Sequence, residues 1–362
     1  MFQDVFIIGA TGKVGAELIN QIILNDGVCA NKHANPTRVV GVASSKTYLY
    51  NKNGLNKQEL LGFSNKEIFG KDYGNVLELI NVVDDNIDNI FIDVTAGKEE
   101  MLDFHLKVIN ETKFRIVTAN KNPLVLCGTK IFRSLIKDAR RYGYRCSVMA
   151  GAEAVGKMVD LTDLGDIPKN ISGCFSGTLG YLTSELENGN KLSNAVAKAV
   201  ELGFTEPNPV VDLNGGDVAR KMLILVRSAG FQMNYEDIDL KPFVSNELLK
   251  SNNIEELLLN LKKADDDFEK MFLDAKNKNN TFRFVGEFDS SKNKVSVGLK
   301  EIKIDSPLGQ LKGNSNKIVV VTGVYTSKNP YVVESPGAGL KVTAQNIRRD
   351  LLSMLDGRQI GY

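Results

Sequence analysis

Short apolar runs alternate with amphipathic stretches through the first half of the chain. The runs predict strands, and the stretches between them, where apolar residues recur at helical spacing, predict helices. Strands are expected at Val5–Ile8, Val39–Ala43, Ile90–Val94 and Arg115–Thr118, with helices beginning at about Lys13 and about Glu99. Because strands that alternate with helices pair in parallel through right-handed crossovers, this half predicts a doubly wound parallel sheet of the α/β class.

The pattern changes after about residue 150. Two helices are expected, one opening at Ser193 and closing before Gly203 and one over about 216–229. Three later segments alternate apolar and polar residues, which predicts strands of a mixed or antiparallel sheet. These segments are 282–288, 295–299 and 317–325. The second half therefore predicts an α+β domain.

The domain bounds follow from this change of pattern. A chain of 362 residues is too long for one ordinary core, so two domains are expected. We place the first at 1–145 and 336–362 and the second at 146–335, with its central strands within 281–335. The last segment begins as a glycine-rich turn and continues as a helix, which Thr343 is expected to cap.

Composition excludes several classes of function. Lysine plus arginine number 45 and aspartate plus glutamate 44, so no net field favours nucleic acid or a membrane surface, and a small-molecule substrate is expected. No apolar run approaches the ~18 residues of a membrane span, and the N-terminus reads directly into a strand rather than a signal peptide. Four cysteines without a CxxC pair and two histidines favour a cytoplasmic protein without a metal site. The cysteines are Cys29, Cys127, Cys146 and Cys174.

Three glycines separate the first expected strand from its helix, at the spacing GxxGxxG. A lone glycine triplet is often a plain tight turn, but this one follows an apolar strand and opens an amphipathic helix. Glycines there let a pyrophosphate approach the N–H groups at the positive end of the helix. We therefore expect a Rossmann-like dinucleotide-binding domain with contacts from Gly9, Thr11, Gly12, Lys13, Val14 and Gly15.

The end of the second strand bears on the choice between NAD and NADP. A carboxylate at this place accepts a hydrogen bond from the ribose 2′-hydroxyl of NAD. The chain instead has Ser44, Ser45 and Lys46, whose hydroxyls and ammonium group suit a 2′-phosphate. NADP is the expected cofactor, and NAD is the alternative because most loop lysines are merely solvated.

Two segments carry groups that suit proton transfer during hydride chemistry. Oxidation of an alcohol requires a group that takes the hydroxyl proton as the hydride leaves. Lys121 follows an expected strand at the edge where doubly wound sheets bind ligands, although a lysine there is as often a solvated loop residue. Asp217 and Lys221 are four residues apart on an expected helix, so they share one face.

The helix that carries Asp217 and Lys221 continues with Met222–Val226, which is apolar nearly all round and predicts burial. An exposed ion pair is the commonest outcome of this spacing. On a buried helix, however, a charged pair must face a partner or a cleft, because unpaired burial of a charge is costly, and we expect a cleft. Glu206, in a loop with two prolines, is either a further site carboxylate or a turn residue.

With these residues in view, the chain resembles the homoserine dehydrogenase family over nearly its whole length. The most specific segment is GFTEPNPVVDLNGGDVARKMLIL, which resembles the family signature. The other similar segments are VGVASSK (40–46), DVTAG (93–97), TANKNP (118–123), FSGTLGY (175–181) and SPGAGLKVTAQNIRRDL (335–351). The resemblance implies NAD(P)-dependent interconversion of homoserine and aspartate 4-semialdehyde, in threonine, methionine and isoleucine biosynthesis.

The resemblance also implies roles for individual residues. Lys221 and Lys121 would be catalytic lysines that handle the hydroxyl proton, Asp217 would hold Lys221 and the reacting oxygen, and Glu206 would bind the substrate amino group. Further site residues that it implies are Asp212, Gly177 and Thr178 around the substrate, and Thr95 and Gly337 around the cofactor. The active site would then lie in a cleft between the domains. A homodimer formed through the sheet of 281–335 is expected, without a kinase or regulatory domain.

The chain departs from the family pattern at three places. The glycine turn is one residue longer than GxGxxG and is similar to the turn of aspartate-semialdehyde dehydrogenases. Arg145 stands where many members have a glutamate that helps bind a structural cation; an arginine cannot ligate a cation, and it could replace one. Phe204 stands where a tyrosine is common.

Two alternatives remain open at this point. An aspartate-semialdehyde dehydrogenase would need a nucleophilic cysteine beside a base. His33 lies in a polar stretch, His105 on an expected surface helix, and Cys146 and Cys174 resemble small core residues, so this reading is disfavoured. A catalytically silent dinucleotide sensor is the other alternative, and loss of either lysine would have favoured it.

Overall fold

The computed structural model describes residues 2–32, 37–85 and 88–355, and among these the side chains of 26–32 are not described. His33 and the side chain of Cys29 thus lie outside the described residues. The chain forms two compact units, one of Met1–Gly151 with Ala338–Tyr362 and one of Ala152–Gly337.

The first unit is built on a seven-stranded sheet with the order β4-β3-β2-β1-β5-β6-β7. Its strands are β1 (Gln3–Ile8), β2 (Thr37–Ala43), β3 (Thr47–Tyr50), β4 (Lys71–Asp72), β5 (Asn89–Asp93), β6 (Arg115–Thr118) and β7 (Tyr142–Gly143). The five strands from β2 to β7 in this order pair in parallel, and β3 and β4 add an antiparallel edge. The predicted Rossmann-like parallel sheet is confirmed.

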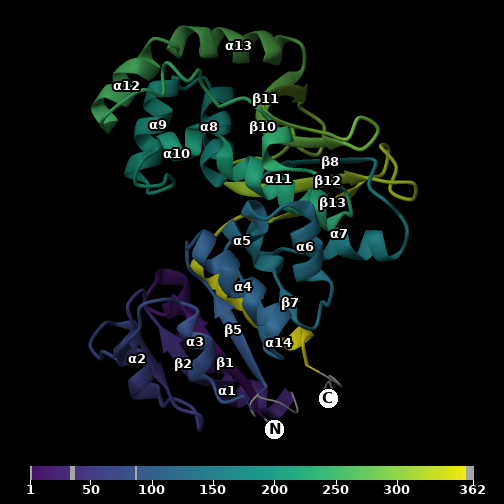
Figure 1. Cartoon of the computed structure of the whole chain (residues 1–362). Helices are drawn as coiled ribbons and strands as arrows, with labels where there is room; N and C mark the ends of the chain where they lie inside the picture. The colour runs from purple at the N-terminus through teal and green to yellow at the C-terminus, as the bar shows by residue number, and fades with distance from the viewer. Residues whose placement is uncertain (1, 33–36, 86–87, 356–362) are drawn as a thin grey trace. The chain divides into compact units, whose positions relative to one another are not determined.

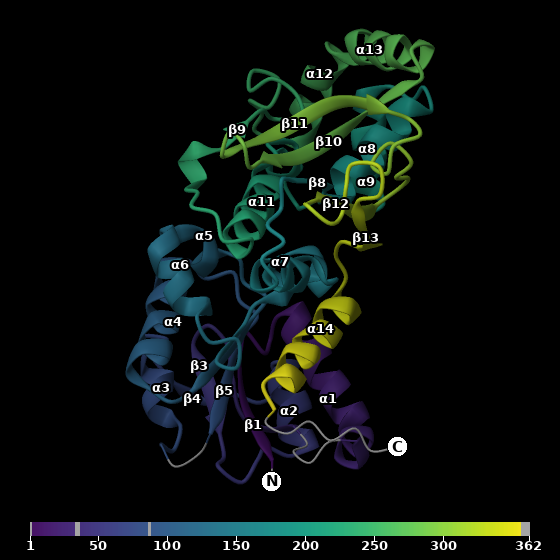
Figure 2. The same ribbon diagram turned by 90° about the vertical axis from the view of Figure 1, so that its right-hand side faces the viewer.

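Helices cover both faces of this sheet. They are α1 (Lys13–Lys32), α2 (Lys57–Ser64), α3 (Glu78–Val82), α4 (Glu99–Glu111), α5 (Asn122–Leu126), α6 (Thr129–Ile136) and α14 (Leu340–Ser353), with short 3-10 turns η1 (Arg145–Ser147) and η2 (Met149–Gly151). In Figures 1 and 2, α1 and α14 lie on one side of β1 and β5, and α4 lies on the other. One core joins apolar residues of β1, β2 and β5 to α1 and α14, while Phe91 of β5 packs edge-on against Phe104 of α4.

The C-terminal helix α14 returns to the first unit and is held there by polar contacts. Gln3 donates from Nε2 to the Leu351 carbonyl at 2.7 Å. The backbone N–H of Arg145 donates to the buried carboxylate of Asp350 at 3.0 Å, and the guanidinium lies 3.5 Å from the same carboxylate. The predicted cap at Thr343 is wrong, because α14 already begins at Leu340 and the Thr343 hydroxyl donates back to the Gly339 carbonyl at 2.9 Å.

The second unit is built on a six-stranded sheet with the order β13-β12-β8-β10-β11-β9. Its strands are β8 (Asn170–Cys174), β9 (Asp239–Leu240), β10 (Asn280–Asp289), β11 (Lys294–Lys303), β12 (Ser315–Val321) and β13 (Tyr331–Pro336). Neighbouring strands are antiparallel except β9, which pairs in parallel with β11. The predicted mixed sheet is confirmed, and β8 joins it from outside the segment that was expected to supply the strands.

The helices of the second unit are α7 (Ala154–Asp163), α8 (Gly177–Glu187), α9 (Leu192–Glu201), α10 (Val210–Leu213), α11 (Gly216–Ser228), α12 (Ile254–Lys262) and α13 (Asp265–Asn277), with a 3-10 turn η3 (Tyr235–Asp237). Helices α8, α11 and α13 pack against β10. Helix α11 is buried along most of its length, as its apolar sequence predicts. Because α11 packs on β10, the positions of Asp217 and Lys221 in its first two turns are set by the core of this unit.

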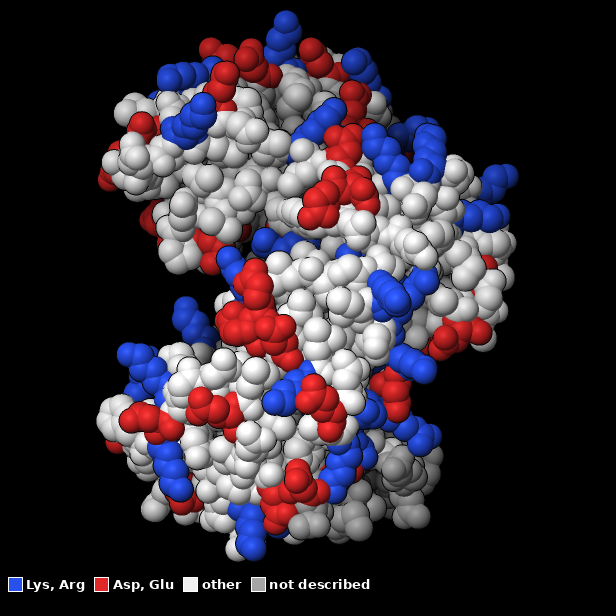
Figure 3. All heavy atoms as spheres, viewed as in Figure 1, with Lys and Arg blue, Asp and Glu red and all other residues white. Residues whose placement is uncertain are grey.

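The surface mixes charges of both signs. On the face drawn in Figure 3, lysine and arginine are interspersed with aspartate and glutamate, in keeping with the near balance of 45 and 44 such residues. Among the helices of the described residues, none is long and apolar enough to cross a membrane.

Candidate functional site

The glycine turn between β1 and α1 has a backbone that only glycines fit. Gly9 has a φ of 92°, in the left-handed region, and its N–H donates to the Ala43 carbonyl at 2.9 Å. A Cβ on Gly15 would lie 2.3 Å from the Gly9 carbonyl oxygen. The turn therefore ties the end of β1 to the end of β2 and brings the first turn of α1 close to both.

A cavity of about 620 Å³ lies beside this turn. Small-molecule sites typically measure about 300–1,000 Å³. The cavity lies at the carboxyl ends of β1, β2 and β5, where doubly wound folds bind nucleotides. Six of the predicted cofactor residues line it: Gly9, Thr11, Gly12, Ser44, Ser45 and Thr95.

The remaining predicted cofactor residues are placed differently. Lys13, Val14 and Gly15 form the first turn of α1, and Lys46 is exposed on the loop after β2. Gly337 belongs to the second unit, where a Cβ on it would collide with the Asn316 side chain at 1.7 Å. The contact with Asn316 gives Gly337 a packing role within its own unit.

A further segment that lines the cavity was missed by the sequence analysis. Residues Tyr73–Val76, after β4, form part of the wall. The Tyr73 hydroxyl donates to the Ser44 carbonyl at 2.6 Å, and its N–H donates to the Lys46 carbonyl at 3.0 Å. The Ser44 hydroxyl accepts from Thr47 N at 3.0 Å within the turn, which leaves Ser45 as the more exposed of the two serines.

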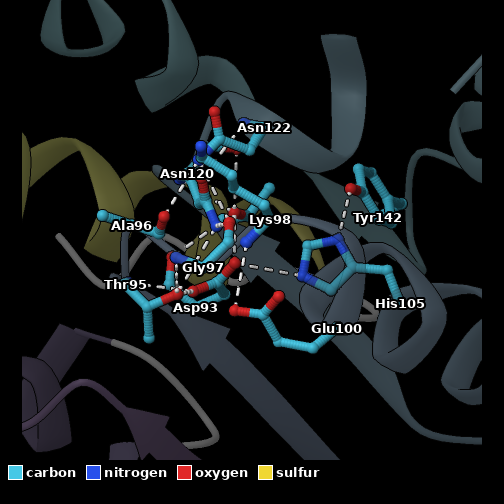
Figure 4. Close-up of polar contacts among 11 residues, drawn as sticks. Asp93, Thr95, Ala96, Gly97, Lys98, Glu100, His105, Asn120, Asn122 and Tyr142 are labelled. Carbon is cyan, nitrogen blue, oxygen red and sulfur yellow. Dashed lines mark hydrogen bonds and ion pairs between the residues drawn. The ribbon is translucent and has the colours of Figure 1, made fainter. Parts of the chain in front are cut away.

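The loop after β5 forms another wall of the cavity, and Figure 4 shows how its residues are held. One oxygen of Asp93 accepts from the Thr95 N–H at 2.8 Å and from the Thr95 hydroxyl at 2.7 Å. The Thr95 oxygen in turn accepts from Gly97 N at 3.1 Å. The Thr95 hydroxyl is thus turned inward, so that its methyl group faces Gly9, where an added Cβ would lie 3.1 Å from it.

Two asparagines connect this loop to the segment after β6. Asn120 donates from Nδ2 to the Gly97 carbonyl at 2.9 Å, and Asn122 donates to the Ala96 carbonyl at 3.0 Å. Lys121 stands between them, half-buried, at the start of α5. The sequence pattern pointed only to the lysine, although the asparagines on either side of it set the loop geometry.

In the second unit, Lys221 is 8% exposed and lies on the buried helix α11. Its Nζ is 2.8 Å from Asp217 Oδ2 and donates to the Phe175 carbonyl at 2.6 Å. Asp217 lies one turn earlier on α11, and Arg220 approaches its other oxygen at 3.6 Å. The predicted pairing of Asp217 and Lys221 on a buried helix is therefore present, with a backbone carbonyl as a third partner.

Asp212 connects the loop of Glu206 to the start of α8. Its Oδ2 accepts from Glu206 N at 2.8 Å, and its Oδ1 lies 3.0 Å from the Thr178 hydroxyl. Thr178 also donates to the Phe204 carbonyl, at 2.6 Å, and a hydroxyl has only one proton to give. Gly177 precedes Thr178 in the first turn of α8, so four predicted substrate residues meet in this region.

The electrostatics of this region disfavour a further negative charge. Burial raises the pKa of Asp212 above its usual value, the hydrogen bonds from Glu206 N and Thr178 lower it, and the charges of Glu206 and Asp217 raise it further. The Glu206 side chain itself is exposed. Because Asp217 is already paired with Lys221 and Arg220, the Asp212 and Glu206 carboxylates are the two that suit a cationic ligand.

The cysteines and the second histidine bear on the acyl-transfer alternative. Burial raises the pKa of Cys174 to about 12 and that of Cys146 well above its usual range, so neither thiol is an activated nucleophile. His105 was expected on a surface helix, which is wrong, because its side chain is fully buried. Within the described residues, no three His, Cys, Asp or Glu side chains gather as a metal site.

The doubly wound sheet and the cavity at its glycine turn are typical of the dinucleotide-binding α/β class, and the second unit adds a buried lysine–carboxylate pair. A family model for homoserine dehydrogenase matches residues 155–352. The homoserine dehydrogenase of Schizosaccharomyces pombe is 30% identical over 370 residues, which cover 97% of this chain and 95% of that protein. The chain therefore belongs to the homoserine dehydrogenase family, as the sequence predicted.

Two further comparisons add to this assignment. The chloroplastic bifunctional aspartokinase/homoserine dehydrogenase 2 of Zea mays is 30% identical over 351 residues, or 95% of this chain and 37% of that protein. The chain spans 37–43% of the length of such bifunctional relatives. A hyperthermophilic archaeal homoserine dehydrogenase, solved in complex with NADPH, superposes with a TM-score of 0.73 over 98% of both chains at 20% identity, which shows the shared fold.

Proposed function

We propose that this chain catalyses the NAD(P)-dependent interconversion of L-homoserine and L-aspartate 4-semialdehyde. The observation that carries the proposal is Lys221, buried between the Asp217 carboxylate and the Phe175 carbonyl. Nζ has three positions besides its bond to carbon, and these two partners take two of them. The third is available to the substrate oxygen.

The proposed chemistry moves one proton at Nζ of Lys221. When bound, the dinucleotide accepts the hydride from the carbon that bears the hydroxyl. The hydroxyl proton passes to the lone pair of the unprotonated amine at Nζ as the C–O bond becomes a carbonyl, and in the reverse direction the ammonium group so formed returns this proton to the carbonyl oxygen. Asp217 orients Nζ from 2.8 Å. Lys121 of the other unit is proposed as the second lysine of the reaction, as the family resemblance implies.

The proposed substrate ligands are the carboxylates of Glu206 and Asp212, while Asp217 is paired with Lys221. Glu206 and Asp212 together suit the ammonium group of an amino acid, because a bound cation offsets their mutual repulsion. Thr178, which follows Gly177 in the first turn of α8, contacts Asp212, and both residues are proposed to line the substrate site. This arrangement favours homoserine over an alcohol without an amino group.

For the cofactor, NADP is proposed over NAD. Ser44 and Ser45 line the cavity, and the exposed Lys46 follows them with no carboxylate in between. A 2′-phosphate would find hydroxyls and a cation there. Lys46→Glu should lower the affinity for NADPH about tenfold and leave that for NADH within about twofold. The same charge reversal at Lys113, exposed elsewhere in this unit, is the control.

We also propose a homodimer formed through the sheet of the second unit. A shallow cavity of about 300 Å³ beside this sheet has Ile302, Pro307, Leu308 and Val319 in its lining. Sedimentation equilibrium tests the proposal, and a monomer at micromolar concentration would rule out a stable dimer.

The activity is tested by adding homoserine and either NADP or NAD to the full chain and following nicotinamide reduction at 340 nm. Homoserine-dependent reduction is expected. Binding of dinucleotide without any homoserine-dependent reduction would favour the silent sensor, and reduction that requires aspartate semialdehyde and phosphate would favour the acyl-transfer enzyme.

The role of Lys221 is tested against a lysine in closely similar surroundings. Lys317 of β12 is 7% exposed, lies 2.7 Å from the Glu334 carboxylate and donates to the Pro307 carbonyl at 2.9 Å. Lys221→Met should lower kcat about 10³-fold with little change in dinucleotide affinity. Lys317→Met removes a buried lysine with equivalent partners and should leave kcat within about threefold. Equal losses in the two variants would mean that Lys221 is structural.

A further inference from the structure

Three buried polar side chains lie behind the cavity of the first unit and take no part in the proposed chemistry. They are Asp93 at the end of β5, His105 on α4 and Tyr142 on β7, each at most 2% exposed. Figure 4 shows them in a row, with the imidazole between the carboxylate and the phenol. Buried ionisable groups are costly unless they are paired, so this row requires an explanation.

The contacts of the imidazole indicate which of its two nitrogens carries the proton. Burial raises the pKa of Tyr142 well above its usual value, so its hydroxyl keeps its proton and can donate to His105 Nδ1, 2.8 Å away. The ring proton of a neutral imidazole is then on Nε2, which lies 3.3 Å from Asp93 Oδ2. This contact does not have the geometry of a regular hydrogen bond, so it is an electrostatic contact between the polar N–H group and the carboxylate.

Asp93 connects His105 to the cavity wall, because it also binds Thr95, which lines the cavity. Its Oδ1 accepts both the N–H and the hydroxyl of Thr95, while its Oδ2 faces His105 and lies 3.4 Å from the Thr118 hydroxyl. Thr95 is thereby held with its methyl toward Gly9 and its oxygen accepting from Gly97 N. The loop Thr95–Gly97 and the glycine turn are the two walls that meet at this point of the cavity.

We propose that His105 is a positioning residue for dinucleotide binding, acting through Asp93 to fix the loop Thr95–Gly97 against the glycine turn. The proposal rests on the proposed function only in taking a dinucleotide as the ligand of this cavity. His105 itself is fully buried and does not line the cavity.

A purely structural role explains the row less well. Helix α4 packs here with aromatic neighbours, including Phe104 beside the His105 ring. An apolar side chain of similar volume would fill the same space without the cost of desolvating an imidazole and a carboxylate. The imidazole adds a polar contact to Oδ2 of Asp93, which helps to keep Oδ1 oriented toward Thr95.

Two amide substitutions distinguish the contact of Nε2 with Asp93 from the contact of Nδ1 with Tyr142. In His105→Gln the amide reaches about as far as Nε2 and retains a donor for Asp93, whereas in His105→Asn it reaches only the Nδ1 position and Tyr142. We expect His105→Asn to weaken the binding of NADPH and NADH about five- to tenfold, and His105→Gln to stay within about twofold of the unchanged chain. Phe104→Leu, a packing change on the same helix, should stay within twofold as well.

The measurement is a fluorescence titration of each nucleotide with the full chain, since the chain has no tryptophan to interfere. The KM for homoserine should be unchanged in all these variants, because the proposed effect is confined to nucleotide binding. General damage to the fold would change this KM as well. Equal dissociation constants for the Asn and Gln variants would overturn the proposal. If the unchanged chain bound no dinucleotide, the proposed function itself would fail, which is a different result.

A double-mutant cycle supplies a second test, because His105 acts on the cavity only through Thr95. Thr95→Val removes the hydroxyl that Asp93 holds. When Thr95→Val is already present, His105→Asn should add less than a twofold loss of affinity, so that the two effects are not additive. Independent, multiplicative losses would contradict the route through Asp93 and Thr95, even if each single variant bound more weakly.

Discussion

Two carboxylates, one in each unit, have pKa values that are shifted in opposite directions. Asp93 is fully buried, and although burial raises its pKa, the contacts with His105 and Thr95 outweigh burial and hold the pKa below its usual value. Asp212 is only half-buried, yet burial and the charges of Glu206 and Asp217 raise its pKa. The more deeply buried group is therefore the one that is more easily ionised.

The difference lies in what each carboxylate has as partners within the protein. Around Asp93 the fold supplies donors to both oxygens, so the charge is satisfied before any ligand arrives. Around Asp212 the fold supplies one backbone donor, a shared hydroxyl and two further negative charges. A carboxylate of the first kind supports a cavity wall, while one of the second kind is suited to receive a cation from outside.

The largest expected effect that tests this comparison is on stability. Asp93→Asn keeps the shape of the side chain but removes the charge that His105 and Thr95 are arranged to meet. We expect the free energy of unfolding of the first unit to fall by about 2–4 kcal/mol, because a buried, fully partnered charge is lost and its partners remain buried. Urea unfolding followed by circular dichroism measures the change. A loss below about 1 kcal/mol would show that the row around Asp93 is not a paired charge.

The matching change in the other unit should affect binding more than stability. Asp212→Asn removes a charge that the folded chain disfavours, so the free energy of unfolding should change by less than about 1 kcal/mol. The KM for homoserine should rise about tenfold, since a hydrogen-bonded charge near the ammonium group is lost, and the affinity for the dinucleotide should not change. If Asp212→Asn destabilised the chain as much as Asp93→Asn, the two carboxylates would not differ in kind.

The elements that local pattern predicts best are those whose function is also local. The strand, glycine turn and helix over the first 30 residues follow one another in sequence, and β1 and α1 begin within two residues of the positions expected. Asp217 and Lys221 lie on one helix, so their pairing follows from spacing alone. In these cases the sequence contains both partners of the contact within a few residues.

Contacts between distant segments could not be predicted in this way. Tyr73 reaches Ser44 across 29 residues, and Asp93, His105 and Tyr142 come from three separate elements. The burial of His105 did have a local signal, since the buried residues of α4 recur at helical spacing and His105 belongs to that stripe. It was missed because histidine was counted as polar, and its partners fix its role only in the folded chain.

The smallest expected effect is the response of the two carboxylates to pH. Because the folded-state pKa of Asp93 is lowered, its contribution to stability is fully present above the usual carboxyl pKa of about 4 and is lost only as the pH falls through the lower folded value. Because that of Asp212 is raised, its cost to the folded state is present at neutral pH and is relieved as the pH falls toward about 4.

Of these two carboxylates, therefore, only Asp212 should titrate between pH 7 and about pH 4.5, and the stability of the unchanged chain should rise relative to that of Asp212→Asn by less than about 1 kcal/mol. Homoserine keeps its ammonium group over this range and prefers the ionised carboxylate, so its KM should increase about two- to threefold as the pH falls. Asp212→Asn should remove most of this dependence. If the dependence persisted in that variant and disappeared in Asp93→Asn instead, the assignment of the two carboxylates would have to be exchanged.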